Sequence, residues 1–144
     1  MPVWDFHISP GLFSTSERQT LVKQITSIYT GVGLPAFYVQ VRFIEEQASA
    51  MYVGGEEHTN FAWISIQHIA RSLDTTEKKE WFLRSVDEVL TPVLEAKGAD
   101  WEYAVHETPR DLWKVNGLVP PPTGSEAERK WVELNRPISY ELQA

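Results

Sequence analysis

The start of this sequence offers a group that can act in acid–base chemistry. Pro2 follows the first methionine directly, so removal of Met1 would leave a secondary amine. An α-amino group has a reference pKa of about 7.7–8.0, and burial or a nearby cation lowers that pKa towards a value that suits a general base. Pro2 is also compatible with a purely structural role as the rigid first residue of an edge strand. The rest of the chain has to distinguish the two.

The segment His68-Ile-Ala-Arg71 is a second candidate for chemistry. It follows an apolar stretch typical of a strand and precedes an amphipathic helix, and sites gather at the carboxyl ends of strands in parallel sheets. Arg71 offers a planar fork that matches a carboxylate, while His68 can donate a hydrogen bond or carry a charge. The alternative is a capped turn with an exposed arginine. The residue types and their position are compatible with a binding site for a carboxylate.

Three further side chains are weaker candidates. Tyr29 lies near the end of a predicted helix, either as a buried aromatic residue or as a hydroxyl donor. Trp113 and Asn116 lie in a predicted short helix and its cap, and an asparagine before glycine is often only a helix C-cap. The remaining histidines have no metal-ligand spacing, and the sequence has no glycine-rich phosphate loop. We therefore predict neither a metal nor a cofactor.

The elements that position these residues occur twice in the sequence. Residues 3–8 alternate as in a strand, Ser14-Thr-Ser-Glu17 fits a capping box, residues 21–32 have helical spacing, and residues 37–43 read as a second strand. The same order returns sixty residues later, as strand 61–67, capping box 74–77 with Asp74 as N-cap, helix 81–94 and strand 101–106. Two turn-rich connections separate and follow these units.

The duplication predicts an α+β fold in a single domain of residues 1–144. Two β-α-β repeats, at about 2–46 and 61–107, form a four-stranded mixed sheet with two helices on one face. A C-terminal arm, 109–144, adds a short helix ended by Asn116-Gly117 and another near 125–134. Since strand 37–43 is apolar at nearly every position, we expect a partner subunit to cover the other sheet face. The alternative is that the C-terminal arm covers it.

Composition excludes several classes of function. The formal net charge is -7, which argues against nucleic acid as the main partner, because phosphate binding needs a basic surface. No apolar run is long enough for a membrane span, and no signal peptide is apparent. The chain has no cysteine, so thiolate chemistry and disulfides are excluded. A cytoplasmic location is the default expectation.

Several segments together resemble the tautomerase superfamily. PVW at the start, GLPAFYVQVRF, YVGG, the HIAR run and PRDLWKVNGLVPPP are similar to the oxalocrotonate tautomerase group that is related to cis-3-chloroacrylic acid dehalogenase. The similarity covers roughly residues 2 to 135 and is specific as a set. It implies a homotrimer whose sheets face inward and an amino-terminal proline catalyst, which would be Pro2. The resemblance therefore implies an isomerase of the tautomerase type that is similar to cis-3-chloroacrylic acid dehalogenase (cis-CaaD).

The same resemblance implies roles for individual residues of this sequence. In the dehalogenase branch two arginines bind the substrate carboxylate; the second matches Arg71, whereas the first falls on His68. A histidine of that branch falls on Tyr29, and its active-site tyrosine aligns near Tyr103 or the following alanine. The water-activating glutamate falls at Val115 or the following asparagine, neither of which is a base. This departure ranks dehalogenation and hydration low.

Keto–enol tautomerisation of a small 2-hydroxy or 2-oxo acid needs less machinery. Pro2 serves as the base and proton carrier, and Arg71 and His68 hold the carboxylate and steady the enolate. Tyr29 and Asn116 are candidate partners of the carbonyl or enol oxygen, and Tyr103 and Trp113 complete the expected substrate contacts. A decarboxylase of a 3-oxo acid is an alternative on the same fold. If Met1 stays on the chain, a non-catalytic trimeric binding module is the other alternative.

Overall fold

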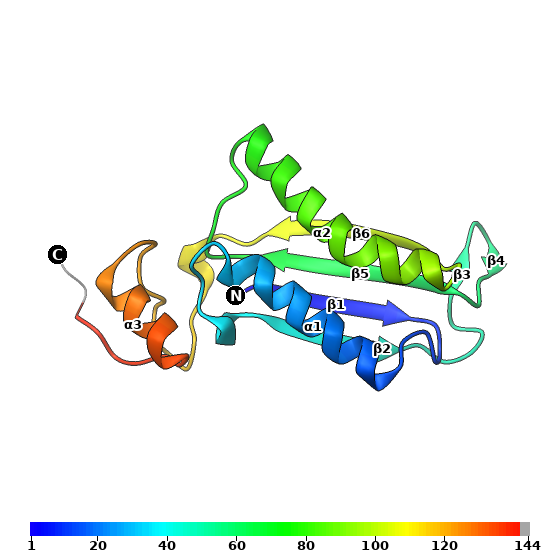
Figure 1. Ribbon diagram of the computed structural model, residues 1–144, viewed down its shortest axis with the longest axis horizontal. Helices are drawn as coiled ribbons and strands as arrows, with labels where there is room; N and C mark the ends of the chain where they lie inside the picture. The colour runs from blue at the N-terminus through cyan, green and yellow to red at the C-terminus, as the bar shows by residue number, and fades with distance from the viewer. Residues whose placement is uncertain (142–144) are drawn as a thin grey trace.

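Two β-α-β units build the sheet, as the repeated pattern predicts. The computed structural model describes residues 1–141, and both long helices lie on one face of a four-stranded sheet (Figure 1). This confirms the predicted fold class. The first unit comprises β1 (Val3–Ile8), α1 (Thr15–Thr30) and β2 (Gln40–Glu45), and the second comprises β5 (Phe61–His68), α2 (Thr76–Ala96) and β6 (Asp100–Glu107). A small hairpin, β3 (Tyr52–Val53) with β4 (Glu56–Glu57), lies between them.

The sheet topology brings the start of the chain to the end of the second repeat. The strand order is β2-β1-β5-β6, with parallel pairs β1–β2 and β5–β6 and an antiparallel pair β1–β5. Val3 is in register with Gln67. Pro2 therefore comes next to the last residue of β5, His68, at the carboxyl edge of β5 and β6.

The hydrophobic core lies between the sheet and the two helices. Alternation along β1 directs Trp4, Phe6 and Ile8 towards the helices, and all three are fully buried. The helices meet them with side chains at helical spacing. These buried side chains are Leu21, Ile25 and Tyr29 of α1 and Phe82, Val86, Leu90 and Leu94 of α2.

The opposite sheet face is more polar than the sequence predicts. Residues 37 and 38 form part of a 3-10 turn, η1 (Ala36–Tyr38), and the strand begins only at Gln40. The expectation of an apolar strand from residue 37 was therefore wrong at its start. On β2 the side chains facing away from the helices include Arg42, which pairs with Asp5 of β1 through both carboxylate oxygens. The helices leave this face uncovered.

The helix starts confirm one capping prediction and correct the other. Ser14 caps α1 and forms the complete capping box with Glu17. For α2 the N-cap is Thr75, whose side chain accepts from the Lys78 backbone, rather than Asp74 as predicted. Asp74 instead pairs with the Lys78 ammonium at 2.7 Å. None of the described helices is both long and apolar enough to cross a membrane.

The C-terminal arm differs most from the prediction. A single 3-10 turn, η2 (Arg110–Leu112), replaces the expected short helix. Asn116 and Gly117 both have positive φ and join Val115 to Leu118, whose backbones exchange two hydrogen bonds, so this pair forms a tight hairpin turn instead of a helix cap. Helix α3 (Glu126–Leu134) forms as predicted and lies beyond the strand ends, not on the open sheet face (Figure 1).

Candidate active site

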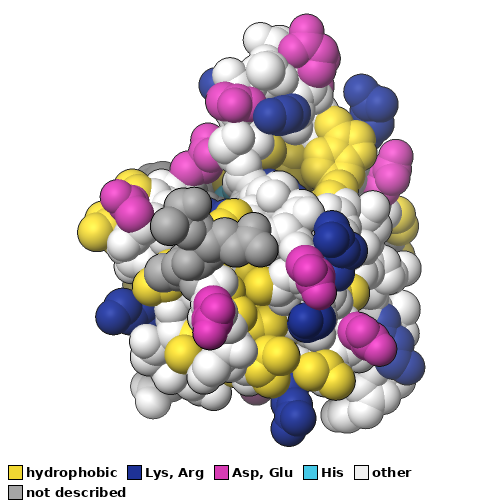
Figure 2. Space-filling view, turned by 90° about the vertical axis from the view of Figure 1, so that its left-hand side faces the viewer, with side chains coloured by type: hydrophobic (Ala, Val, Ile, Leu, Met, Phe, Trp, Pro, Cys, Tyr) yellow, Lys and Arg dark blue, Asp and Glu magenta, His cyan; other side chains and the backbone are white. Residues whose placement is uncertain are grey.

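A pocket of about 810 Å³ lies at the carboxyl ends of β5 and β6. It gathers Tyr29, His68 and Arg71, three of the residues that the sequence singled out. The C-terminal end of α1, the first turns of α2 and the loops next to them form a mainly apolar wall. Its residues are Ile28, Val32, Leu73, Trp81 and Phe82. At this end of the molecule, charged side chains of both signs are interspersed with exposed hydrophobic ones (Figure 2). The pocket therefore combines an apolar wall with a few convergent polar groups.

His68 is the most constrained polar side chain of the pocket. Only 3% of its surface is exposed, and its ring lies 4.8 Å from that of Phe82 and 6.0 Å from that of Tyr29. Neither ring nitrogen has a hydrogen-bond partner within residues 1–141. Burial lowers the pKa of His68, and the carboxylate of Glu107 opposes this effect only in part. Burial therefore favours the neutral imidazole, whose buried ring has one donor and one acceptor without a partner among residues 1–141.

The lowered pKa makes stability depend on pH. The unfolded chain protonates His68 near pH 6.5, whereas the folded chain does so only at lower pH. Because the unfolded state then binds more protons, the free energy of unfolding should fall as pH drops below about 6.5. A His68→Asn variant should therefore lose part of this slope in urea titrations. Equal slopes for His68→Asn and wild type would contradict the assignment.

Tyr29 belongs to both the core and the pocket. It is 1% exposed, and its hydroxyl accepts a hydrogen bond from the Trp4 indole at 2.8 Å. Burial raises the pKa of Tyr29, so the phenol keeps its proton at neutral pH. Tyr29 is therefore a buried aromatic residue of the core and, at the same time, one of the residues that line the pocket.

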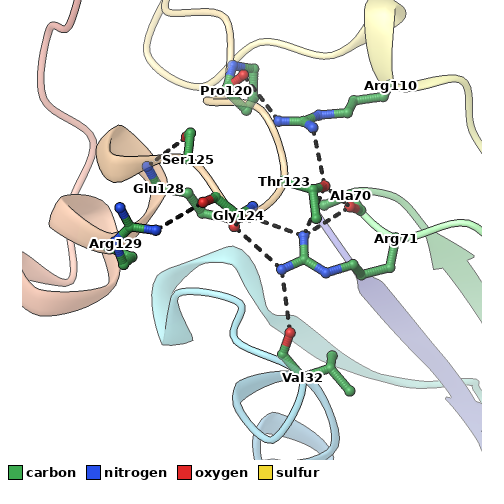
Figure 3. A network of polar contacts seen from close by, with 10 residues as sticks. All are labelled: Val32, Ala70, Arg71, Arg110, Pro120, Thr123, Gly124, Ser125, Glu128 and Arg129. Carbon is green, nitrogen blue, oxygen red and sulfur yellow. Dashed lines mark hydrogen bonds and ion pairs between the residues drawn. The ribbon is translucent and has the colours of Figure 1, made fainter.

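Arg71 is surrounded by groups of the protein itself (Figure 3). Its guanidinium donates to both oxygens of Glu128, at 2.9 and 3.4 Å, and Glu128 is 4% exposed. Further hydrogen bonds reach the Ala70 and Val32 carbonyls and the Thr123 hydroxyl. Arg71 therefore ties the ends of α1 and β5 to the C-terminal arm, and its carboxylate partner is already present.

The start of the chain lies in an environment that disfavours a charged amine. Pro2 is buried, and its carbonyl accepts from the backbone of Gln40 at 2.9 Å. Burial lowers the pKa of the Met1 amino group from 8.0 to about 4, and the nearby charge of Arg110 adds to this effect. In this structure the Pro2 nitrogen is still part of the peptide bond to Met1. The Met1 amino group is therefore neutral at physiological pH.

Three predicted site residues lie elsewhere. Tyr103 donates to Asp87 of α2 at 2.8 Å, Asn116 is exposed in its hairpin turn, and Trp113 is buried with its ring 4.8 Å from that of Tyr38. None of the three lines the pocket. Of the predicted set, the pocket thus brings together Tyr29, His68 and Arg71, whereas Pro2 lies beside His68 in the sheet register and is not a lining residue.

Comparison with known proteins assigns the chain to a family. The family described as "Putative oxalocrotonate tautomerase enzyme" matches residues 1–136. This chain belongs to the tautomerase superfamily. The resemblance drawn from the sequence is thereby confirmed. No curated protein matches this superfamily member.

Solved structures of similar proteins agree with this membership. A probable enzyme from the thermophilic fungus Aspergillus fumigatus is 51% identical, with a TM-score of 0.93 over 97% of this chain and 98% of its own. Native RhCC from Rhodococcus jostii RHA1 is 41% identical, with a TM-score of 0.92 over 96% and 99% of the two chains. N1, a member of the cis-3-chloroacrylic acid dehalogenase family, is 24% identical, with a TM-score of 0.73 over 92% and 97%, and shares the fold.

Sequence reasoning missed two residues that shape the site of this tautomerase superfamily member. Arg110 lines the pocket shortly after β6 ends, so the rule that directed attention to the end of β5 also applied here. Glu128 is the third residue after the N-cap of α3, Ser125, where a glutamate is typical of a capping box. Nothing in the sequence indicated that its carboxylate would pair with Arg71 instead.

Proposed function

We propose that this protein is a keto–enol tautomerase of small 2-hydroxy or 2-oxo carboxylic acids, with Pro2 as the general base after removal of Met1. One observation carries the proposal: the start of β1 is buried beside a cation, and an amine there has its pKa lowered to about 4 when it belongs to Met1. Because Pro2 is buried beside Met1, we expect a pyrrolidine amine at this position to have a lowered pKa as well. It is then unprotonated and able to accept a proton.

The proposed steps use Pro2 together with groups that line the pocket. The amine of Pro2 takes the proton from the enol hydroxyl, and the electron pair of that bond forms the carbonyl. The carbon–carbon double bond then takes up the proton from Pro2 at a carbon along the conjugated chain, so the amine is regenerated. Neutral His68 and the Tyr29 hydroxyl hydrogen-bond the oxygen on which charge develops. An arginine of the pocket holds the carboxylate of the acid.

Hydration of an unsaturated acid is a second candidate. Glu107 lines the pocket and supplies a carboxylate, although its Oε2 already accepts from the Leu73 backbone at 3.0 Å. Position 115 or 116, where the dehalogenase branch has its water-activating glutamate, lies in the hairpin turn away from the pocket. Tautomerisation, which needs no activated water, therefore ranks first. Decarboxylation of a 3-oxo acid would use the same pocket and is compared in the same assays.

A homotrimer is part of this proposal. The sheet face opposite the helices is uncovered within the described chain, and it mixes apolar side chains such as Trp63 with the Asp5–Arg42 pair. Q0 fused 4-OT, a fold neighbour at 23% identity and a TM-score of 0.65, is a symmetric trimer. Three copies with these faces turned inward would bury them together. Sedimentation equilibrium should give three times the chain mass of 16.5 kDa.

The activity is measured on protein from which Met1 has been removed, and intact-mass spectrometry verifies the removal. Phenylenolpyruvate, an enolic 2-hydroxydienoate, malonate semialdehyde and a 3-haloacrylate are followed side by side by ultraviolet absorbance and nuclear magnetic resonance. We expect accelerated ketonisation of the enols without release of carbon dioxide or halide. Mature protein that leaves the enols at their uncatalysed rate would contradict the tautomerase assignment. Turnover of only the other acids would favour the alternatives.

A further inference from the structure

Two arginines approach the pocket, and their surroundings differ (Figure 3). The two terminal nitrogens of Arg71 donate hydrogen bonds to the Glu128 carboxylate, to the carbonyls of Ala70 and Val32, and to the Thr123 hydroxyl. Arg110 has only the Pro120 carbonyl at 3.1 Å and the Thr123 hydroxyl at 3.4 Å. Among residues 1–141, no carboxylate lies within ion-pair distance of Arg110.

The position of Arg110 relative to the candidate base fits a role in substrate binding. Its charge acts on the amino end of the chain, so the guanidinium lies near the group that would take the proton. It also acts on the buried hydroxyl of Tyr38, which has no hydrogen-bond partner among the described residues. The indole nitrogen of Trp113, three residues further along, is likewise buried without a partner.

We infer that Arg110, and not Arg71, binds the carboxylate of the substrate in this protein. The inference rests on the proposed function for the identity of the substrate as a small acid, but the assignment of the arginine rests on the contacts alone. Arg71 would have to give up its pairing with a buried carboxylate in order to bind a second one, leaving Glu128 unpaired. Arg110 can accept a carboxylate without losing any charged partner. Its planar fork allows a bidentate contact.

These separate roles of Arg110 and His68 indicate which acids the pocket should bind best. With its carboxylate at Arg110 and its enol oxygen at His68, a bound acid would extend towards the apolar wall formed by residues such as Trp81 and Phe82. Such a wall favours an aryl or unsaturated chain over a second charged group. We therefore expect monocarboxylic acids with an apolar tail to bind better than dicarboxylic acids of similar length.

The assignment is tested by binding and by turnover. Intact, Met1-free wild-type protein, Arg110→Met and Arg110→Lys are titrated with trans-cinnamate, an aryl carboxylate that cannot tautomerise, and in parallel with cinnamamide. Arg84→Met, which replaces an exposed arginine of α2 outside the pocket, is the matched control. Isothermal titration calorimetry gives Kd, and circular dichroism with thermal melts checks folding. The same proteins are assayed with phenylenolpyruvate and its methyl ester.

Loss of a charged, bidentate contact should weaken cinnamate binding roughly ten- to a hundredfold in Arg110→Met. Arg110→Lys should bind with intermediate strength, cinnamamide should bind all variants alike, and Arg84→Met should match wild type. Turnover of the acid should drop while turnover of the ester is little changed. Unchanged cinnamate binding in folded Arg110→Met, or no binding of cinnamate by wild type, would overturn the inference. Arg110-dependent binding without any tautomerase activity would instead contradict only the proposed function.

Discussion

Replacing Pro2 by alanine should lower kcat/KM for an enolic 2-oxo acid by roughly 10²–10⁴-fold, the usual contribution of a positioned general base. The variant also loses Met1 during expression, but its primary amine lacks the ring that fixes the direction of the lone pair. The pocket and its arginines remain, so binding of an unreactive carboxylate should be nearly unchanged. Ketonisation rates and cinnamate titration on the same preparation separate the two effects.

A second change to the chain start provides the control. Inserting glutamate between Met1 and Pro2 keeps methionine in place, and the Pro2 nitrogen then stays an amide without basicity. Intact mass verifies the retained methionine. This extended protein should be at least as inactive as Pro2→Ala. Wild-type turnover by either protein would exclude Pro2 as the base.

Arg71→Met should reduce the free energy of unfolding by about 3–5 kcal/mol, because it leaves the carboxylate of Glu128 buried and unpaired. The side chains of the pair are only 21% and 5% exposed, so water screens the interaction little. Removing both partners avoids the unpaired charge, and Arg71→Met with Glu128→Met should therefore recover much of the loss. Urea denaturation monitored by circular dichroism measures both variants.

The sequence alone assigned a different role to Arg71, and the same experiment distinguishes the two. A substrate-binding arginine would, when replaced, mainly raise KM or lower kcat/KM for acids and change stability little. A structural arginine would, when replaced, lower stability and impair activity only as far as the pocket loosens. Normal stability of Arg71→Met combined with a large loss of acid binding would contradict the structural role and restore the original assignment.

Much of the fold could be predicted because it depends on local patterns of apolar and capping residues. Alternation in residues 3–8, helical spacing after Ser14, and the return of this order sixty residues later specify two β-α-β units. Errors occurred where two local structures share one sequence signal. Asn116-Gly117 suits a helix end and a tight hairpin equally, and only pairing of the flanking residues, Val115 with Leu118, decides for the hairpin.

By itself, the sequence determined that a proline stands before the first strand, and that an acidic chain must bind any acid in a local pocket. It also determined that a histidine, with an arginine three residues later, stands where the strand of the second repeat ends. Only the tertiary structure decided which arginine has a carboxylate partner. Glu128 is 57 residues from Arg71, and their pairing depends on where the C-terminal arm folds back. Whether an arginine already has all of its hydrogen-bond partners depends on which residues are its neighbours in space, and the spacing of residues along the chain does not show this.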